Sequence, residues 1–139
     1  MVSTSALDFR IPSDLGQIEG IVAQVVHRCR ECRFDARLLS LNVPVALTEA
    51  IANAMLRGNG EDVAKEVRIR AEVSEVRLVV EVEDEGEGFD LDACAEDPTT
   101  PENLAREDGR GLFLMRTLMD EVVQVEGSSH VVRLTLRRR

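Results

Sequence analysis

Apolar and polar residues alternate along several stretches of the chain, and this period of two predicts β-strands. The clearest stretches cover residues 67–73 and 76–82, where Val, Ile, Ala and Leu alternate with mainly charged residues. They meet at Ser74-Glu75, so we expect an antiparallel hairpin with one solvated face. Similar patterns predict three further strands, over residues 6–12, 122–125 and 131–136.

Three other stretches carry apolar residues at helical spacing. The first covers about residues 14–32, with Ser13 and Asp14 as candidate N-caps. The second has Asn42 as its expected cap and Pro44 in its first turn, where a proline is tolerated. It ends near Gly58-Asn59-Gly60, a strong stop signal. Residues 112–119 form the third helix, and residues 35–40 form a connector with room for one helical turn.

Residues 90–108 differ from the rest because they are polar and show no sustained period. A loop of this length in a small domain is usually functional or mobile. The alternating strands and the order of the elements predict an α+β fold. We expect a two-layer sandwich, with a mostly antiparallel mixed sheet and three helices on one face. No repeat or linker divides the chain, so residues 1–139 are interpreted as a single domain.

Composition and charge argue against several classes of protein. With 26 acidic and 17 basic residues, the net charge is -9, whereas a nucleic-acid-binding protein needs a basic face. No apolar run approaches membrane-spanning length and the N-terminus lacks a signal-peptide layout, so we expect a cytoplasmic protein without a membrane segment. Cys29 and Cys32 form a C-x-x-C within a helical pattern. They lack a second pair at zinc spacing, so we interpret them as two thiols on one side of a helix.

Glu49 and Asn53 are the first candidate site residues, because they lie four apart on a helix and share a face. Alone, the pair fits a solvated helix edge. It also fits a carboxylate and an amide oxygen that point into a pocket. An amide oxygen suits Mg²⁺, which takes water and phosphate oxygens as its other ligands. A neighbouring carboxylate could accept a proton from a nucleophile that attacks a γ-phosphate.

The segment Asp84-x-Gly86-x-Gly88-Phe89 is the most informative motif, because it places a carboxylate at the end of an apolar strand. The aspartate could form a turn, or it could accept a hydrogen bond from an amino group such as that of adenine. The glycines allow the backbone to approach a ligand closely.

A third candidate segment is Gly109-Arg110-Gly111-Leu112, at the start of the third helix. The glycines could simply loosen the helix start, or the free N–H groups of the helix N-terminus could bind phosphate. Arg106 and Arg110 flank this segment, and either could reach a phosphate. The chain lacks a P-loop, and its Gly-x-Gly lacks the third glycine of a dinucleotide fingerprint, so ATP binding would need another design.

Together, the segments E-A-I-A-N-A (49–54), D-E-G-E-G-F (84–89) and G-R-G-L (109–112) resemble the N, G1 and G2 boxes of the Bergerat-fold (GHKL) ATPases. This family includes histidine kinases, gyrase and mismatch-repair ATPases. The resemblance covers essentially the whole chain, and the short length is most similar to that of the bacterial anti-sigma-factor serine/threonine kinases.

The resemblance implies a role for each motif. Asn53 would bind Mg²⁺ that bridges the phosphates of ATP, and Glu49 would be the general base or a polarising carboxylate. Asp84 would recognise the adenine amino group, while Gly86, Gly88 and Phe89 would lie against the nucleotide. Residues 90–108 would form the ATP lid. Phosphate contacts would come from the residues of the third segment and its surroundings, namely Arg106, Gly109, Arg110, Gly111 and Leu112. Members often carry His shortly after the Asn-Ala pair, whereas this chain has Arg57, which could contact a phosphate or a partner or lie at the surface.

The function implied by the resemblance is that of a regulatory kinase. It would sequester a sigma factor and use Mg·ATP to phosphorylate a Ser or Thr of an anti-sigma-factor antagonist, and it would form a homodimer through its first strand and first helix. The alternatives are a non-catalytic switch that binds partners in a nucleotide-dependent way, or the detached catalytic domain of a histidine kinase. For the last of these, no dimerisation helix with a phosphoacceptor histidine is evident, and His27 fits a surface or packing residue.

Overall fold

The computed structural model describes residues 4–89, 91, 107–127 and 130–138. Five strands form one sheet: β1 (Ser5–Pro12), β2 (Glu66–Val73), β3 (Arg77–Asp84), β4 (Glu121–Gln124) and β5 (Val131–Arg137). Their order is β1-β2-β3-β5-β4, and all four neighbouring pairs are antiparallel. The predicted strands and the mostly antiparallel sheet are confirmed. No parallel pair occurs among the described strands.

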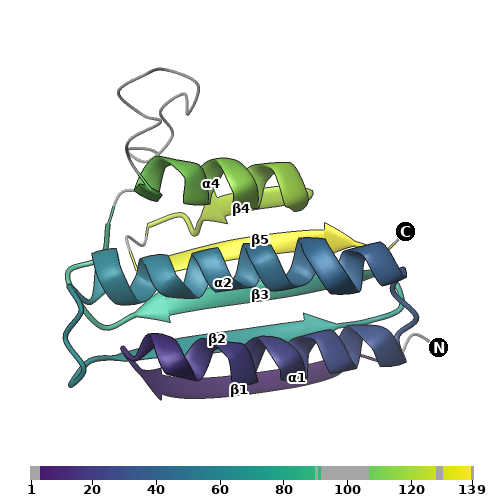
Figure 1. Ribbon diagram of the computed structural model, residues 1–139, viewed down its shortest axis with the longest axis horizontal. Coiled ribbons are helices and arrows are strands. Elements are labelled where there is room, and N and C mark those ends of the chain that lie inside the picture. Colours follow the sequence, from purple (N-terminus) through teal and green to yellow (C-terminus); the bar gives the residue numbers. More distant parts are fainter. Residues whose placement is uncertain (1–3, 90, 92–106, 128–129, 139) are drawn as a thin grey trace.

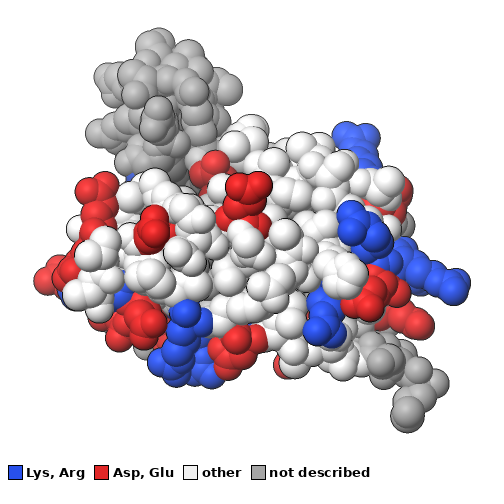
Figure 2. Space-filling view, turned by 60° about the horizontal axis from the view of Figure 1, so that its bottom comes forward, with Lys and Arg blue, Asp and Glu red and all other residues white. Residues whose placement is uncertain are grey.

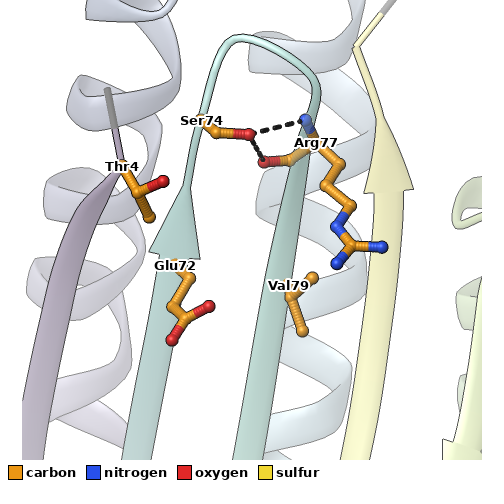
Figure 3. A pocket seen from close by; sticks show the side chains of 5 residues that line it. All are labelled: Thr4, Glu72, Ser74, Arg77 and Val79. Atoms are coloured by element: carbon orange, nitrogen blue, oxygen red, sulfur yellow. Dashed lines mark hydrogen bonds between the residues drawn. The ribbon is translucent and has the colours of Figure 1, made fainter. Parts of the chain in front are cut away.

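Ser74 closes the hairpin between β2 and β3. Its Oγ accepts hydrogen bonds from the backbone N–H groups of Val76 (3.1 Å) and Arg77 (3.2 Å), and the turn is drawn in Figure 3. The register pairs Val73 with Leu78 next to the turn, and it pairs Val67 with Asp84 at the far end. The turn and the register therefore place Asp84 at the opposite end of the hairpin, beside the start of β2.

The helices α1 (Ile18–Glu31), α2 (Val43–Asn53) and α4 (Glu107–Leu118) cover one face of this sheet (Figure 1). The core lies between the layers, because the inward residues of the strands are buried against apolar helix residues such as Val25, Leu47 and Ile51. A 3₁₀ turn, η1 (Leu15–Gln17), precedes α1. Asp14 caps this turn, and its Oδ1 accepts a hydrogen bond from the Gly16 N–H. The predicted α+β sandwich is confirmed.

The opposite face of the sheet is charged and solvated. Arg68 donates two hydrogen bonds to the Asp8 carboxylate, at 3.0 and 2.6 Å, and this guanidinium lowers the pKa of Asp8. Arg133 donates to Glu81 on the neighbouring strand β3 at 3.0 Å. Such pairs between strands favour the observed register. Figure 2, turned by 60° from Figure 1, shows the surface from another side, where acidic and basic side chains are separated by broad uncharged areas.

The central helix is longer than the sequence pattern predicts. Helical structure runs without a break from residue 36 to residue 58, through the π-helical turn η2 (Leu38–Asn42), α2 and a second π-helical turn, η3 (Ala54–Gly58). The prediction that Asn42 caps a helix was wrong. Its backbone is helical, and its side-chain amide donates instead to the carbonyl of Leu118 at the end of α4 (2.7 Å).

Pro44 lies inside this helix rather than at its start. A proline lacks an N–H and collides with the carbonyl four residues earlier, so it normally interrupts an α-helix. Here the π-helical turn η2 comes just before it, and the Val43 N–H bonds to the carbonyl of Leu38, five residues back. This wider turn gives a physical reason why the helix continues through the proline.

Within the described chain, the 21-residue segment Leu38–Gly58 is long and apolar enough to cross a membrane by length and composition alone. The expectation that no apolar run approaches that length therefore needs correction. Half of the relevant window is buried inside the protein, as in the core helix of a two-layer fold, while Leu41 and Leu56 are exposed.

The limits of the expected lid also change. Leu91 is buried in the core, and α4 begins at Glu107, so residues 107 and 108 belong to a helix that starts earlier than predicted. The remainder of the expected lid, residues 90 and 92–106, lies outside the described residues, and so does Arg106.

Candidate functional site

Asp84 lies where β3 ends against the last turn of the central helix. A Cβ added to Gly58 would lie only 2.4 Å from the Asp84 Cγ, so the aspartate packs directly on the glycine. A Cβ on Gly86 would lie 1.9 Å from the Gly58 carbonyl oxygen. Because both positions lack a side chain, the helix end and the turn after β3 can approach each other in a way that no other residue would allow.

The carboxylate of Asp84 is fully buried and only partly satisfied. Its Oδ1 accepts a hydrogen bond from the Gly86 N–H at 3.1 Å, and it lies 3.2 Å from the Nδ1 of His130. Its Oδ2 is buried and has no hydrogen-bond partner among the described residues. A buried carboxylate oxygen without a partner is unfavourable, so this atom fits a ligand that offers a hydrogen-bond donor. The amino group of adenine is such a donor.

Asn59 holds the turn after β3, and sequence reasoning missed this role. Its buried side-chain Oδ1 accepts hydrogen bonds from the N–H groups of Glu85 and Gly86, both at 2.8 Å. Its Nδ2 donates to the Ser13 Oγ at 2.9 Å and to the Glu66 carbonyl at 3.1 Å. One amide therefore joins the end of the helix to the residue that follows β1, to β2 and to the Gly-x-Gly segment. The only signal in the sequence was an Asn between two glycines, which predicts a helix end.

The turn continues through Gly88 to Phe89 and Leu91. Gly88 has a φ of +77°, in the left-handed region that glycine adopts without strain. Gln124 of β4 donates to the Phe89 carbonyl at 2.6 Å and accepts from the Leu91 N–H at 3.4 Å. Phe89 itself packs on the edge of the core. The segment that follows Asp84 is thus tied to β4.

Glu49 and Asn53 lie on α2 as predicted, and the start of α4 packs against them. A Cβ on Gly111 would lie 2.8 Å from the Glu49 Oε2 and 3.5 Å from the Asn53 Nδ2. Asn53 is buried and Glu49 is half-buried. Burial raises the pKa of Glu49, which makes its carboxylate a better proton acceptor than an exposed one. Leu112, next to Gly111, is buried in the core.

The remaining predicted residues divide into two groups. Arg57 is half-exposed in η3, four positions after Asn53 on the same helix. Gly109 and Arg110 lie in the first turn of α4, where only the backbone is described. The structure thus connects Glu49, Asn53 and Gly111 by direct packing, and Asp84 and Gly86 through Gly58, at the end of the same helix.

This arrangement fits a magnesium nucleotide. The unsatisfied Asp84 Oδ2 matches an amino group. The side chains of Glu49 and Asn53, on the central helix, offer oxygen atoms beside the first turns of α4. Oxygen donors are those that Mg²⁺ prefers, and it typically takes one or two from the protein and the rest from phosphates and water. By contrast, a hollow lined by Thr4, Glu72 and Arg77 lies beside the β2–β3 turn (Figure 3), far from this site along the hairpin.

Comparison with known families identifies the class of protein. The family model described as "Histidine kinase-like ATPase domain" matches residues 11–136. The chain therefore belongs to the histidine kinase-like ATPase domain family.

Three relatives of this chain share the name serine-protein kinase RsbW. The chain is 42% identical over 99 residues to the serine-protein kinase RsbW of Bacillus subtilis (strain 168), an alignment that covers 68% of this chain and 62% of that protein. It is 35% identical over 130 residues to the serine-protein kinase RsbW of Bacillus pumilus, an alignment that covers 89% of this chain and 78% of that protein. It is 25% identical over 137 residues to the serine-protein kinase RsbW of Staphylococcus aureus, an alignment that covers 93% of this chain and 84% of that protein. The chain thus aligns with about three fifths of the length of the first of these relatives.

Proposed function

We propose that this protein binds ATP and Mg²⁺ at the site between Asp84 and Glu49, and that it is a protein serine/threonine kinase. The observation that carries the proposal is the buried Asp84 Oδ2, which lacks a partner in the described part of the chain and lies against Gly58 at the end of the helix that bears Glu49 and Asn53. The names of the relatives support the kinase activity, because each is called a serine-protein kinase.

In this proposal each side chain has one task. Asp84 accepts a hydrogen bond from the adenine amino group through Oδ2. Asn53 holds Mg²⁺ through its amide oxygen, and the bound ion would offset the negative charge of the phosphates. Glu49 accepts the proton of the attacking Ser or Thr hydroxyl, and its raised pKa suits that role. Gly111 lets the start of α4 pack against Glu49, because a Cβ at this position would lie only 2.8 Å from the Glu49 Oε2.

The biological partners follow from the resemblance described above. We infer that the protein binds a sigma factor and phosphorylates an anti-sigma-factor antagonist in the cytoplasm, without direct contact with nucleic acid or a membrane. We also infer a homodimer. Its support is that β1 lies at the edge of the sheet, so one side of this strand pairs with no other described strand. Light scattering of the purified protein tests the dimer.

Two variants test the nucleotide site and the catalytic role separately. Asp84→Asn should weaken ADP binding by roughly 100-fold in calorimetry. The asparagine side chain would face the adenine amino group either with its NH₂, a donor, or with its neutral oxygen, a weaker acceptor than a carboxylate. Glu49→Gln should keep ADP affinity within about threefold of wild type but reduce transfer from labelled ATP to the antagonist by at least about 100-fold. Unchanged transfer would refute the role of Glu49. Nucleotide binding without transfer by the wild type would instead favour a non-catalytic switch.

A further inference from the structure

His130 contacts Asp84, although 46 positions separate the two residues in the sequence. It lies just before β5, beside the end of β3, and its carbonyl accepts a hydrogen bond from the Asp84 N–H at 3.1 Å. Its side chain, about 40% exposed, returns to the same residue, with Nδ1 at 3.2 Å from Oδ1. The backbone and the side chain of His130 therefore both hold Asp84.

The chemistry of the pair decides which atom carries the hydrogen. We assign the Nδ1–H tautomer to His130, because an ionised carboxylate can only accept a hydrogen bond from this nitrogen, which lies 3.2 Å from Oδ1. The Gly86 N–H donates to the same oxygen. With two donors on Oδ1, the carboxylate cannot rotate freely, and Oδ2 remains as the acceptor for a ligand.

The direction of Oδ2 matters for the choice of base. Adenine carries an amino group at position 6, which donates to a carboxylate oxygen, whereas hypoxanthine and guanine carry an oxygen there, which is repelled by it. A carboxylate held in one orientation therefore binds the 6-amino group and repels the 6-oxo oxygen. A carboxylate that can turn away loses part of the attraction and relieves part of the repulsion.

We propose that His130 is a positioning residue that gives the site its preference for 6-amino over 6-oxo purine nucleotides. The proposal rests on the nucleotide binding proposed above, and it adds a determinant of specificity outside the three sequence boxes. His130 acts through Asp84 and needs no contact with the nucleotide itself.

The test compares ADP with inosine diphosphate, whose base carries an oxygen in place of the 6-amino group and a hydrogen on N1. Both dissociation constants are measured by calorimetry or by competition, for the wild type, His130→Leu and His130→Asn. Leu fills space without an N–H. Asn offers an amide N–H in place of Nδ1. His130→Leu should weaken ADP binding about 10-fold with little change for inosine diphosphate, so the ratio of the two constants falls about 10-fold. His130→Asn should restore the ratio to within about threefold of wild type.

These measurements separate specificity from general damage. A variant that only loosened the fold would lower its thermal midpoint and weaken both nucleotides equally, so the ratio would stay at the wild-type value. That result, or a ratio in His130→Asn as low as in His130→Leu, would overturn the role of His130 while leaving ATP binding intact. A wild-type protein that binds neither nucleotide would overturn this proposal together with the proposed function.

Discussion

Replacement of Gly58 by alanine tests whether the packing of Asp84 on the central helix sets nucleotide affinity. The backbone of Gly58 is not in the left-handed region, so alanine fits the local conformation. In an ordinary helix this change would stabilise the protein, by up to about 1 kcal/mol. Here the new Cβ would lie 2.4 Å from Cγ, 2.5 Å from Oδ2 and 2.6 Å from Cβ of Asp84.

The magnitude follows from these distances. Carbon atoms in contact prefer about 3.5 Å or more, so Asp84 must move by roughly 1 Å. Overpacking of this kind costs about 1–3 kcal/mol, which exceeds the gain in helix propensity. The movement also shifts Oδ2, and loss of one hydrogen bond to a charged group, about 2 kcal/mol, would weaken ADP binding about 30-fold.

The matched control is Gly20→Ala in α1, because Gly20 is exposed and a Cβ there meets nothing within 4 Å. This variant should gain about 0.5–1 kcal/mol of stability and bind ADP like the wild type. Urea denaturation and calorimetry with ADP measure both quantities. If Gly58→Ala also became more stable and bound ADP normally, the contact between Gly58 and Asp84 would not affect nucleotide affinity, and the prediction would be refuted.

Two further predictions concern the pH dependence of Glu49 and the network around Asn59. Because burial raises the pKa of Glu49, folding favours its protonated form. The stability of the wild type relative to Glu49→Gln should therefore be highest below the ordinary pKa of glutamate and should fall as the pH rises through the raised value. Urea titrations between about pH 4 and pH 7 measure this, and a flat difference would contradict it. Asn59→Ala should lower the free energy of unfolding by about 2–4 kcal/mol, since buried donors and acceptors from three segments lose their partner. A loss below about 0.5 kcal/mol in urea denaturation would show that water replaces the amide.

Much of the fold could be predicted because its signals are local. The alternation in β2 and β3 and the spacing of apolar residues in α1 depend on a few neighbouring residues. The same holds for Glu49 and Asn53, whose four-residue separation alone puts them on one side of α2. The position of Asp84 at a strand end was equally readable, since it follows four alternating apolar residues.

The errors came from features whose cause lies elsewhere in the chain. Asn42 was predicted as a cap with Pro44 in the first turn of the helix. A π-helical turn instead lets the helix run through both residues, and the Asn42 amide bonds to α4. Gly58 and Asn59 were interpreted only as a signal that ends the second helix. Their contacts with Asp84, Ser13 and Glu66 arise only when the end of the helix meets distant parts of the chain. The sequence did not indicate His130, because its partner, Asp84, lies 46 positions earlier at the end of β3.

The two halves of the proposed site share the central helix, but each has its own supporting residues, and this predicts that they can fail separately. Asp84 packs on Gly58 in the last turn of that helix and contacts His130 just before β5, while Asn59 holds the turn that follows Asp84. Glu49 instead faces Gly111, in α4, which follows the segment expected to be the lid. Changes around Asp84 should therefore alter affinity for any adenine nucleotide, whatever its phosphates. A bulkier residue at Gly111 should impair phosphate binding and transfer, because its Cβ meets the Glu49 carboxylate, while recognition of the base is retained.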